Sequence, residues 1–176
     1  MIPLRTERLR LRPFTEADAP FVLAGHQSEG LRRFIPSQVL DDPSEVPARI
    51  ERFQRFDDDP VLGVVAVERL ADGAPVGLVM LQPIPPSEGV DRADIEIGWR
   101  GHPEHAGRGY ITEAAATVLD HALATLPRVL AVTHPDNVAS QAVCRRIGMA
   151  DRGLTDDYYD EPGVRLFVID SHPEIK

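Results

Sequence analysis

Short apolar or alternating runs, and apolar residues at helical spacing, divide the chain into strands and helices. Period-two or β-branched runs predict strands at 9–12, 61–70, 76–81, 93–99, 129–133, 154–159 and 165–169. Helical spacing predicts one helix that carries Phe21, Val22 and Leu23, and three more at about 44–56, 110–126 and 137–148. The expected order of elements is therefore β-α-α-β-β-β-α-β-α-β-β.

Turn and capping residues support these boundaries. Thr15 and Asp18 have the spacing of a capping box, and Gly148 is a typical glycine at a helix C-terminus. Antiparallel strands precede strands that alternate with helices. This order predicts an α/β fold with a single mixed central sheet of about six or seven strands, flanked by about four helices. No repeat or linker divides the sequence, so we expect one domain over residues 1–176.

Composition narrows the class of protein. Hydrophobic residues make up 43% and charged residues 27% of the sequence, as in ordinary globular proteins. The net charge of −9 repels phosphate backbones and anionic lipids, so we expect no nucleic acid and no membrane as partner. The same charge would attract cations, including amines. The N-terminal residues lack the continuous apolar core of a signal peptide, so a cytoplasmic location is expected.

The most informative segment covers residues 96–114. It is expected to form a strand, a loop with two glycines and the start of a helix. Free amides at a helix N-terminus bind phosphate, and Gly107 and Gly109 would let an anion approach the backbone, with Arg108 adding positive charge. The spacing alone leaves a phosphate cradle and a plain tight loop equally open. A dinucleotide fingerprint is disfavoured, because Thr112 stands where its third glycine belongs.

Four segments together resemble one known family. They are 4–13 (Leu-Arg-Thr-Glu-Arg-Leu-Arg-Leu-Arg-Pro), 96–99 (Glu-Ile-Gly-Trp), 107–114 (Gly-Arg-Gly-Tyr-Ile-Thr-Glu-Ala) and 137–149 (Asn-Val-Ala-Ser-Gln-Ala-Val-Cys-Arg-Arg-Ile-Gly-Met). In this order they resemble the GNAT superfamily of N-acetyltransferases, in particular the branch of ribosomal-protein N-terminal (Rim-type) acetyltransferases. The resemblance implies a GNAT-like fold and acetyl transfer from acetyl-CoA, the cosubstrate, to a primary amine. It implies no metal.

The resemblance also implies a site for coenzyme A. Backbone amides of the glycine loop would hold the pyrophosphate, and the pantetheine arm would pair with a strand edge as an added strand does. Asn137 matches the asparagine that bonds the pantetheine region, and Ser140 lies one turn further on. The alternative for Asn137 is a helix cap alone. The expected coenzyme-binding residues are Ile97, Gly98, Trp99, His105, Ala106, Gly107, Arg108, Gly109, Tyr110, Asn137 and Ser140.

Two residues depart from the family pattern. Glu104 stands where the superfamily motif has Gln or Arg. Cys144 stands where many members have a tyrosine that protonates the leaving thiolate. Cys144 is therefore a weak candidate for the general acid, and packing within a helix is the alternative.

Glu96 is the first candidate for the general base. Alternation along a strand puts Asp94, Glu96 and Gly98 on one face and the apolar residues between them on the other. Glu96 would then accept the proton of the amine, directly or through water. The alternative is a solvent-facing or salt-bridged carboxylate. The candidates for lining the acceptor pocket are Phe34, Tyr158 and Tyr159.

Several alternatives for the function stay open. The acceptor is a protein N-terminus or an amine-bearing small molecule, and the sequence does not separate the two. An acyl-CoA-binding module with little or no turnover is the alternative of another class, supported by the cysteine at position 144. His102 and His105 flank Glu104, a pattern that also suits a metal, although the family uses none. The oligomeric state is not determined, and a homodimer remains open.

Overall fold

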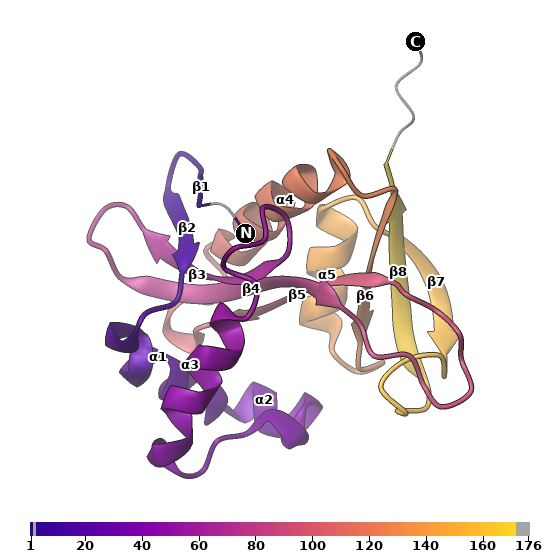
Figure 1. Cartoon of the computed structure of the whole chain (residues 1–176), viewed down its shortest axis with the longest axis horizontal. Helices are drawn as coiled ribbons and strands as arrows, with labels where there is room; N and C mark the ends of the chain where they lie inside the picture. Colours follow the sequence, from indigo (N-terminus) through magenta and orange to yellow (C-terminus); the bar gives the residue numbers. More distant parts are fainter. Residues whose placement is uncertain (2, 172–176) are drawn as a thin grey trace.

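The computed structural model describes residue 1 and residues 3–171, and its strands all belong to one sheet (Figure 1). The strands are β1 (Leu4–Arg5), β2 (Leu9–Pro13), β3 (Gly63–Arg69), β4 (Pro75–Pro83), β5 (Ile95–Gly101), β6 (Arg128–Thr133), β7 (Ala150–Thr155) and β8 (Val164–Asp170). Their order in the sheet is β1-β2-β3-β4-β5-β6-β8-β7. Strands β5 and β6 are parallel, and the other neighbours are antiparallel. The predicted mixed sheet is confirmed.

Helices cover both faces of the sheet. They are α1 (Ala19–His26), α2 (Glu29–Phe34), α3 (Val46–Gln54), α4 (Tyr110–Leu123) and α5 (Val138–Arg146), joined by short 3-10 turns. Helices α4 and α5 pack on one face, in a core that includes Ile97, Val118 and Phe167. Helices α1 and α3 pack on the other face, around Phe14 and Phe53. The two sets of helices lie apart in Figure 1, with the sheet between them.

The sequence underestimated the number of elements. The sheet has eight strands rather than six or seven, because Leu4–Arg5 adds a two-residue edge strand that pairs with β2. The described residues contain five α-helices rather than about four, because α2 has only six residues and one buried side chain, Leu31. An element that short has no measurable period. The capping box is confirmed, since the amide of Thr15 donates to Asp18 Oδ2 at 2.8 Å.

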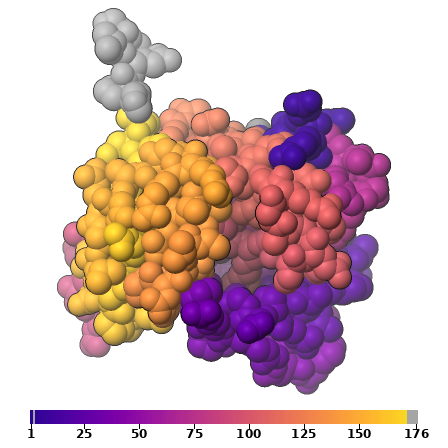
Figure 2. All heavy atoms as spheres, turned by 180° about the vertical axis from the view of Figure 1, so that it is seen from behind, coloured from indigo at the N-terminus to yellow at the C-terminus, as the bar shows by residue number. Residues whose placement is uncertain are grey.

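The sheet divides between its two parallel strands. Strand β5 pairs with β4 along its whole length, but with β6 only through Glu96 and Leu130. Beyond that pair the edges of β5 and β6 face each other without a ladder. Figure 2 shows a recess in the surface between the purple atoms of the α2 region, the salmon atoms of the α4 region and the orange atoms around α5. The split therefore opens a groove that both helical layers can reach.

Both boundaries of one predicted strand were wrong. The sequence predicts a strand over 154–159, but β7 covers Ala150–Thr155 and the chain bends at residues 156–157. Further along the turn to β8, Tyr159 and Asp160 have φ values of 65° and 53°, which lie in the left-handed region. No helix in the part of the chain that the structure describes is long and apolar enough to cross a membrane.

Candidate active site

A buried carboxyl group stands at the point where the sheet divides. Glu96 is 3% exposed and forms the one residue pair between β5 and β6. The phenol of Tyr159 donates a hydrogen bond to Glu96 Oε1, and Gln82 of β4 lies opposite Glu96 in the sheet. Burial raises the pKa of Glu96 to about 7, although the hydrogen bond from Tyr159, the neighbouring Gln82 and the charge of Arg100 oppose the rise. Glu96 can therefore take up and release a proton near neutral pH.

The two adjacent tyrosines lie in different surroundings. Tyr158 is buried, and its phenol donates to Asp94 Oδ2 at 2.9 Å, so it fastens the β7–β8 turn to the start of β5. Tyr159 is 40% exposed and reaches Glu96 from the same turn. Burial and the neighbouring Glu96 raise the pKa of Tyr159, so its phenol stays protonated and acts as a donor. Of the two, Tyr159 is the one that adjoins the groove.

The glycine loop has the backbone geometry of an anion site. Gly107 and Gly109 have φ values of 75° and 77°, which favour glycine, and Gly109 is the N-cap of α4. No amide from Gly107 to Thr112 donates to another group among the described residues. A Cβ added at Gly107 would meet nothing within 4 Å, so this position is open to a ligand. Free amides at the N-terminus of a long helix fit a pyrophosphate.

Arginines surround this loop in an otherwise acidic protein. The guanidinium of Arg8 lies 4.9 Å from the ring centroid of Tyr110, and its Nη1 donates to the carbonyl oxygen of Arg108. The neighbouring guanidiniums of Arg69 and Arg108 lower the pKa of the Tyr110 phenol. Arg8 forms a salt bridge with Glu113, which also accepts a hydrogen bond from Thr6 Oγ1. The local positive charge suits the phosphates of coenzyme A.

The groove between β5 and β6 has free polar groups along its walls. Ile97, Gly98 and Trp99 form the free edge of β5, beyond its pair with β6. Across the split, at the end of β6, the Oγ1 of Thr133 is buried and has no partner among the described residues. Asn137 caps α5 by accepting from the amide of Ser140 at 3.1 Å, and no described residue pairs with its amide NH2. These groups fit the pantetheine arm of coenzyme A.

Cys144 does not line the groove. It is 0% exposed and belongs to the main hydrophobic core. Burial raises the pKa of its thiol to about 12, so the thiol is a poor proton donor at neutral pH. This placement argues against the general-acid role and favours packing.

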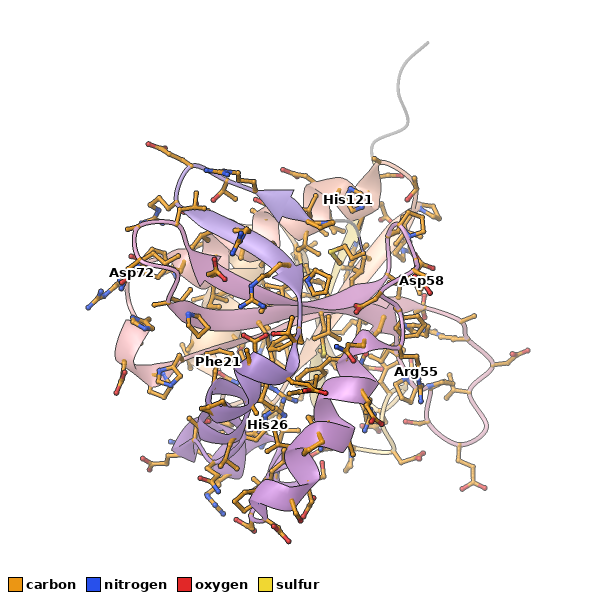
Figure 3. The ribbon with its side chains drawn as sticks, turned by 60° about the vertical axis from the view of Figure 1, so that its left-hand side comes forward. Phe21, His26, Arg55, Asp58, Asp72 and His121 are labelled. Carbon is orange, nitrogen blue, oxygen red and sulfur yellow. The ribbon has the colours of Figure 1, made fainter. Side chains whose placement is uncertain are left out.

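The opposite mouth of the groove is formed by α1 and α2, and α2 carries Phe34, one of the predicted acceptor-pocket residues. Phe34, at the end of α2, lies 5.4 Å from the ring of His134, which follows β6, so α2 reaches across the opening. Arg100 of β5 lies against His26 of α1, with Nη1 and Nε2 2.8 Å apart. Figure 3 shows His26 on α1 beside the sheet. Arg100 could have been found by extending the alternation of Glu96 by two more steps, whereas nothing local in the sequence pointed to His26.

His102, Glu104 and His105 form a cluster with potential metal ligands. Their ligand atoms all lie within 4.8 Å of one another, and His105 Nδ1 is buried without a partner in the described residues. Burial and the charges of Arg69 and Arg108 lower the pKa of His105. That positive charge beside the cluster disfavours a bound cation.

Comparison with known proteins identifies the family. Residues 8–150 match the family described as Acetyltransferase (GNAT) domain. The chain belongs to this family. It is 37% identical to the uncharacterized N-acetyltransferase YnaD of Bacillus subtilis (strain 168) over 61 residues, which cover 34% of this chain and 36% of that protein.

Solved structures of GNAT proteins share the whole fold. An acetyltransferase from Agrobacterium tumefaciens aligns over 98% of this chain and 95% of its own, with a TM-score of 0.78 and 26% identity. RimJ of Mycobacterium smegmatis, in complex with coenzyme A disulfide, aligns over 99% of this chain and 88% of its own, with a TM-score of 0.74 and 22% identity. The resemblance to the Rim-type branch is thereby confirmed at the level of the fold.

Proposed function

We propose that this GNAT protein transfers the acetyl group of acetyl-CoA to a primary α-amine by direct attack in a ternary complex. The observation that carries the proposal is the buried Glu96 carboxyl group at the split of the sheet, with a pKa of about 7. A general base is most effective when its pKa lies near the working pH.

The proposed reaction needs one proton acceptor. The amine nitrogen attacks the thioester carbonyl, the C–N bond forms, and the C–S bond breaks with the electron pair leaving on sulfur. The proton of the amine passes to the Glu96 carboxylate, directly or through one water. Since the thiol of Cys144 is buried, water is the proposed source of the proton for the leaving thiolate.

The pKa of Glu96 favours an α-amine over a lysine-type amine. An α-amino group has a pKa of about 8, whereas an alkyl amine has a pKa of about 10. Transfer of a proton to a base with a pKa of about 7 is thus uphill by about one pKa unit for the α-amine and by about three for the alkyl amine. Protein N-termini and amino acids both supply α-amines.

The proposal is tested by coenzyme A release with matched acceptors. Peptides with a free N-terminus are compared with the same peptides whose only amine is a lysine side chain, at pH 7 and with saturating acetyl-CoA. We expect faster release with the α-amine and loss of turnover in Glu96→Gln. Acetyl-CoA binding without turnover for any amine would instead favour the acyl-CoA-binding module, and an unchanged rate in Glu96→Gln would remove the assigned base.

A further inference from the structure

Three arginines converge on the acceptor side of Glu96. Arg100 lies on the same face of β5 as Glu96, four residues further along the strand. Arg49 and Arg52 are one turn apart on α3, the helix that packs over this side of the sheet. Arg52 and Arg100 are both close enough to Tyr159 to act on its phenol, and both guanidiniums lower its pKa. The cluster therefore adjoins the pair formed by Tyr159 and Glu96.

Within the described residues, no member of this cluster is held in an ion pair. Arg49, Arg52 and Arg100 form no salt bridge with any carboxylate in residues 1 and 3–171. Arg49 donates to Gln38 Oε1, which is neutral. Burial and the charges of Arg49 and Arg52 lower the pKa of Arg100, and Tyr159 and Glu96 oppose this change without cancelling it.

Arg100 is less exposed than Arg52, and in the described part of the chain its guanidinium has a neutral hydrogen-bond partner, His26. His26 Nδ1 lies 2.7 Å from the carbonyl oxygen of Val22, which can only accept, so Nδ1 carries the proton. His26 Nε2 therefore accepts from Arg100 Nη1. Burial and the charge of Arg100 lower the pKa of His26 to about 4, so the histidine stays neutral and fixes the guanidinium without compensating its charge.

A partly buried guanidinium that has no ion-pair partner, as that of Arg100, is costly to fold, and an anion brought by a ligand relieves that cost. The protein as a whole is acidic, with a net charge of −9, so this local excess of positive charge is specific to the site. Guanidinium groups bind carboxylates through bidentate hydrogen bonds, and this interaction is stronger where water is excluded.

We infer that Arg52 and Arg100, supported by Arg49, form a subsite for a carboxylate carried by the acceptor. The inference rests on the proposed function, because it concerns the acceptor of the same reaction. The acceptor is then an α-amine with a carboxylate close by, supplied either by a free amino acid or by an acidic residue near a peptide N-terminus.

Two matched pairs of acceptors test the subsite and separate its two sources. One pair is an amino acid and its carboxamide, and the other is a peptide with Asp or Asn in its second position. We expect kcat/KM to be at least about tenfold higher for the carboxylate in one of the two pairs. The pair that shows this difference tells whether the carboxylate belongs to a free amino acid or to an acidic residue of a peptide. Equal kcat/KM within both pairs for the wild-type protein would overturn the inference and leave the acetyltransferase proposal intact.

Variants on α3 link the preference to the cluster. Arg52→Gln is preferred to a change at Arg100, because Arg52 is exposed and its replacement leaves the core intact. We expect Arg52→Gln to lower kcat/KM more for the carboxylate acceptor than for its carboxamide or Asn partner, so that the carboxylate preference falls to about twofold or less. Arg55→Gln is the matched control, since Arg55 is exposed, follows α3 by one residue (Figure 3) and acts on neither Arg100 nor Tyr159. An equal loss with both acceptors of a pair would contradict the assignment.

Binding of N-acetylated products gives a readout that does not need turnover. The dissociation constants of an N-acetyl amino acid and its carboxamide, and of the corresponding acetylated peptides, are measured by calorimetry with coenzyme A present. Tighter binding of the carboxylate product than of its carboxamide, with the difference lost in Arg52→Gln, supports the subsite. This holds even if no amine is acetylated, because absence of acetylation would refute only the proposed function. No preference in either product pair would overturn the subsite.

Discussion

Replacement of Glu96 by glutamine tests whether the structure forces a carboxyl group into an environment that resists its charge. Burial at the split of the sheet raises the pKa of Glu96 from 4.5 to about 7. The folded protein therefore binds this proton more tightly than the unfolded chain does, and stability falls as the pH rises from 4.5 to 7. At about 1.4 kcal/mol for each pKa unit, the ionised side chain costs about 3 kcal/mol of folding free energy at pH 8.

Glutamine has the same shape, can still accept from the phenol of Tyr159, and carries no charge. We therefore expect Glu96→Gln to raise the free energy of unfolding by about 3 kcal/mol at pH 8 and by less than about 1 kcal/mol at pH 5. Urea denaturation at the two pH values measures both differences. Turnover should fall by about a hundredfold or more in the same variant, because the base is gone. A variant that is destabilised, or stabilised equally at both pH values, would refute the reasoning.

Three further substitutions examine the neighbouring groups. Tyr159→Phe removes a hydrogen bond that lowers the pKa of Glu96. The increase of kcat/KM with pH, expected near pH 7 in the wild-type protein, should therefore shift to higher pH. An unchanged pH profile would contradict the hydrogen bond between Tyr159 and Glu96. Gly107→Val puts a β-branched residue at φ 75°, which strains the loop by about 1–2 kcal/mol, and calorimetry should show about tenfold weaker coenzyme A binding rather than unchanged affinity. Cys144→Ala should lower the free energy of unfolding by about 1 kcal/mol or more while turnover stays within about twofold, and a large loss of kcat would restore the general-acid role.

Local patterns were sufficient for the parts of the fold that have a period or a cap. The alternation along 93–99 predicted the two faces of β5, and the structure confirms that Ile97 enters the core shared with α4. The cap at Asn137 and the start of α4 at Tyr110 were also confirmed. These features depend on residues within a few positions of one another, so the sequence carries the information directly.

The missed features depend on contacts between distant segments. Tyr159 contacts Glu96 because the chain turns after β7 and leaves the extended conformation. No hydrophobic periodicity in the sequence indicates this turn. Arg52 lies on the acceptor side because α3 packs over the sheet. It is 44 positions before Glu96 in the sequence, so no local pattern connects the two residues. The burial of Cys144 likewise follows from how α5 sits against α4 and the strands. Such placements require the three-dimensional structure.

Transfer of a labelled acetyl group tests the central claim most directly. The protein is mixed with stoichiometric acetyl-CoA labelled in the acetyl group and with an α-amine acceptor, and each species is examined by mass spectrometry during a single turnover. The account predicts that the label moves from coenzyme A to the acceptor nitrogen without appearing on the protein, and that Glu96→Gln slows this transfer. Label that accumulates on the protein, or that is released only as acetate, would contradict direct transfer to an amine.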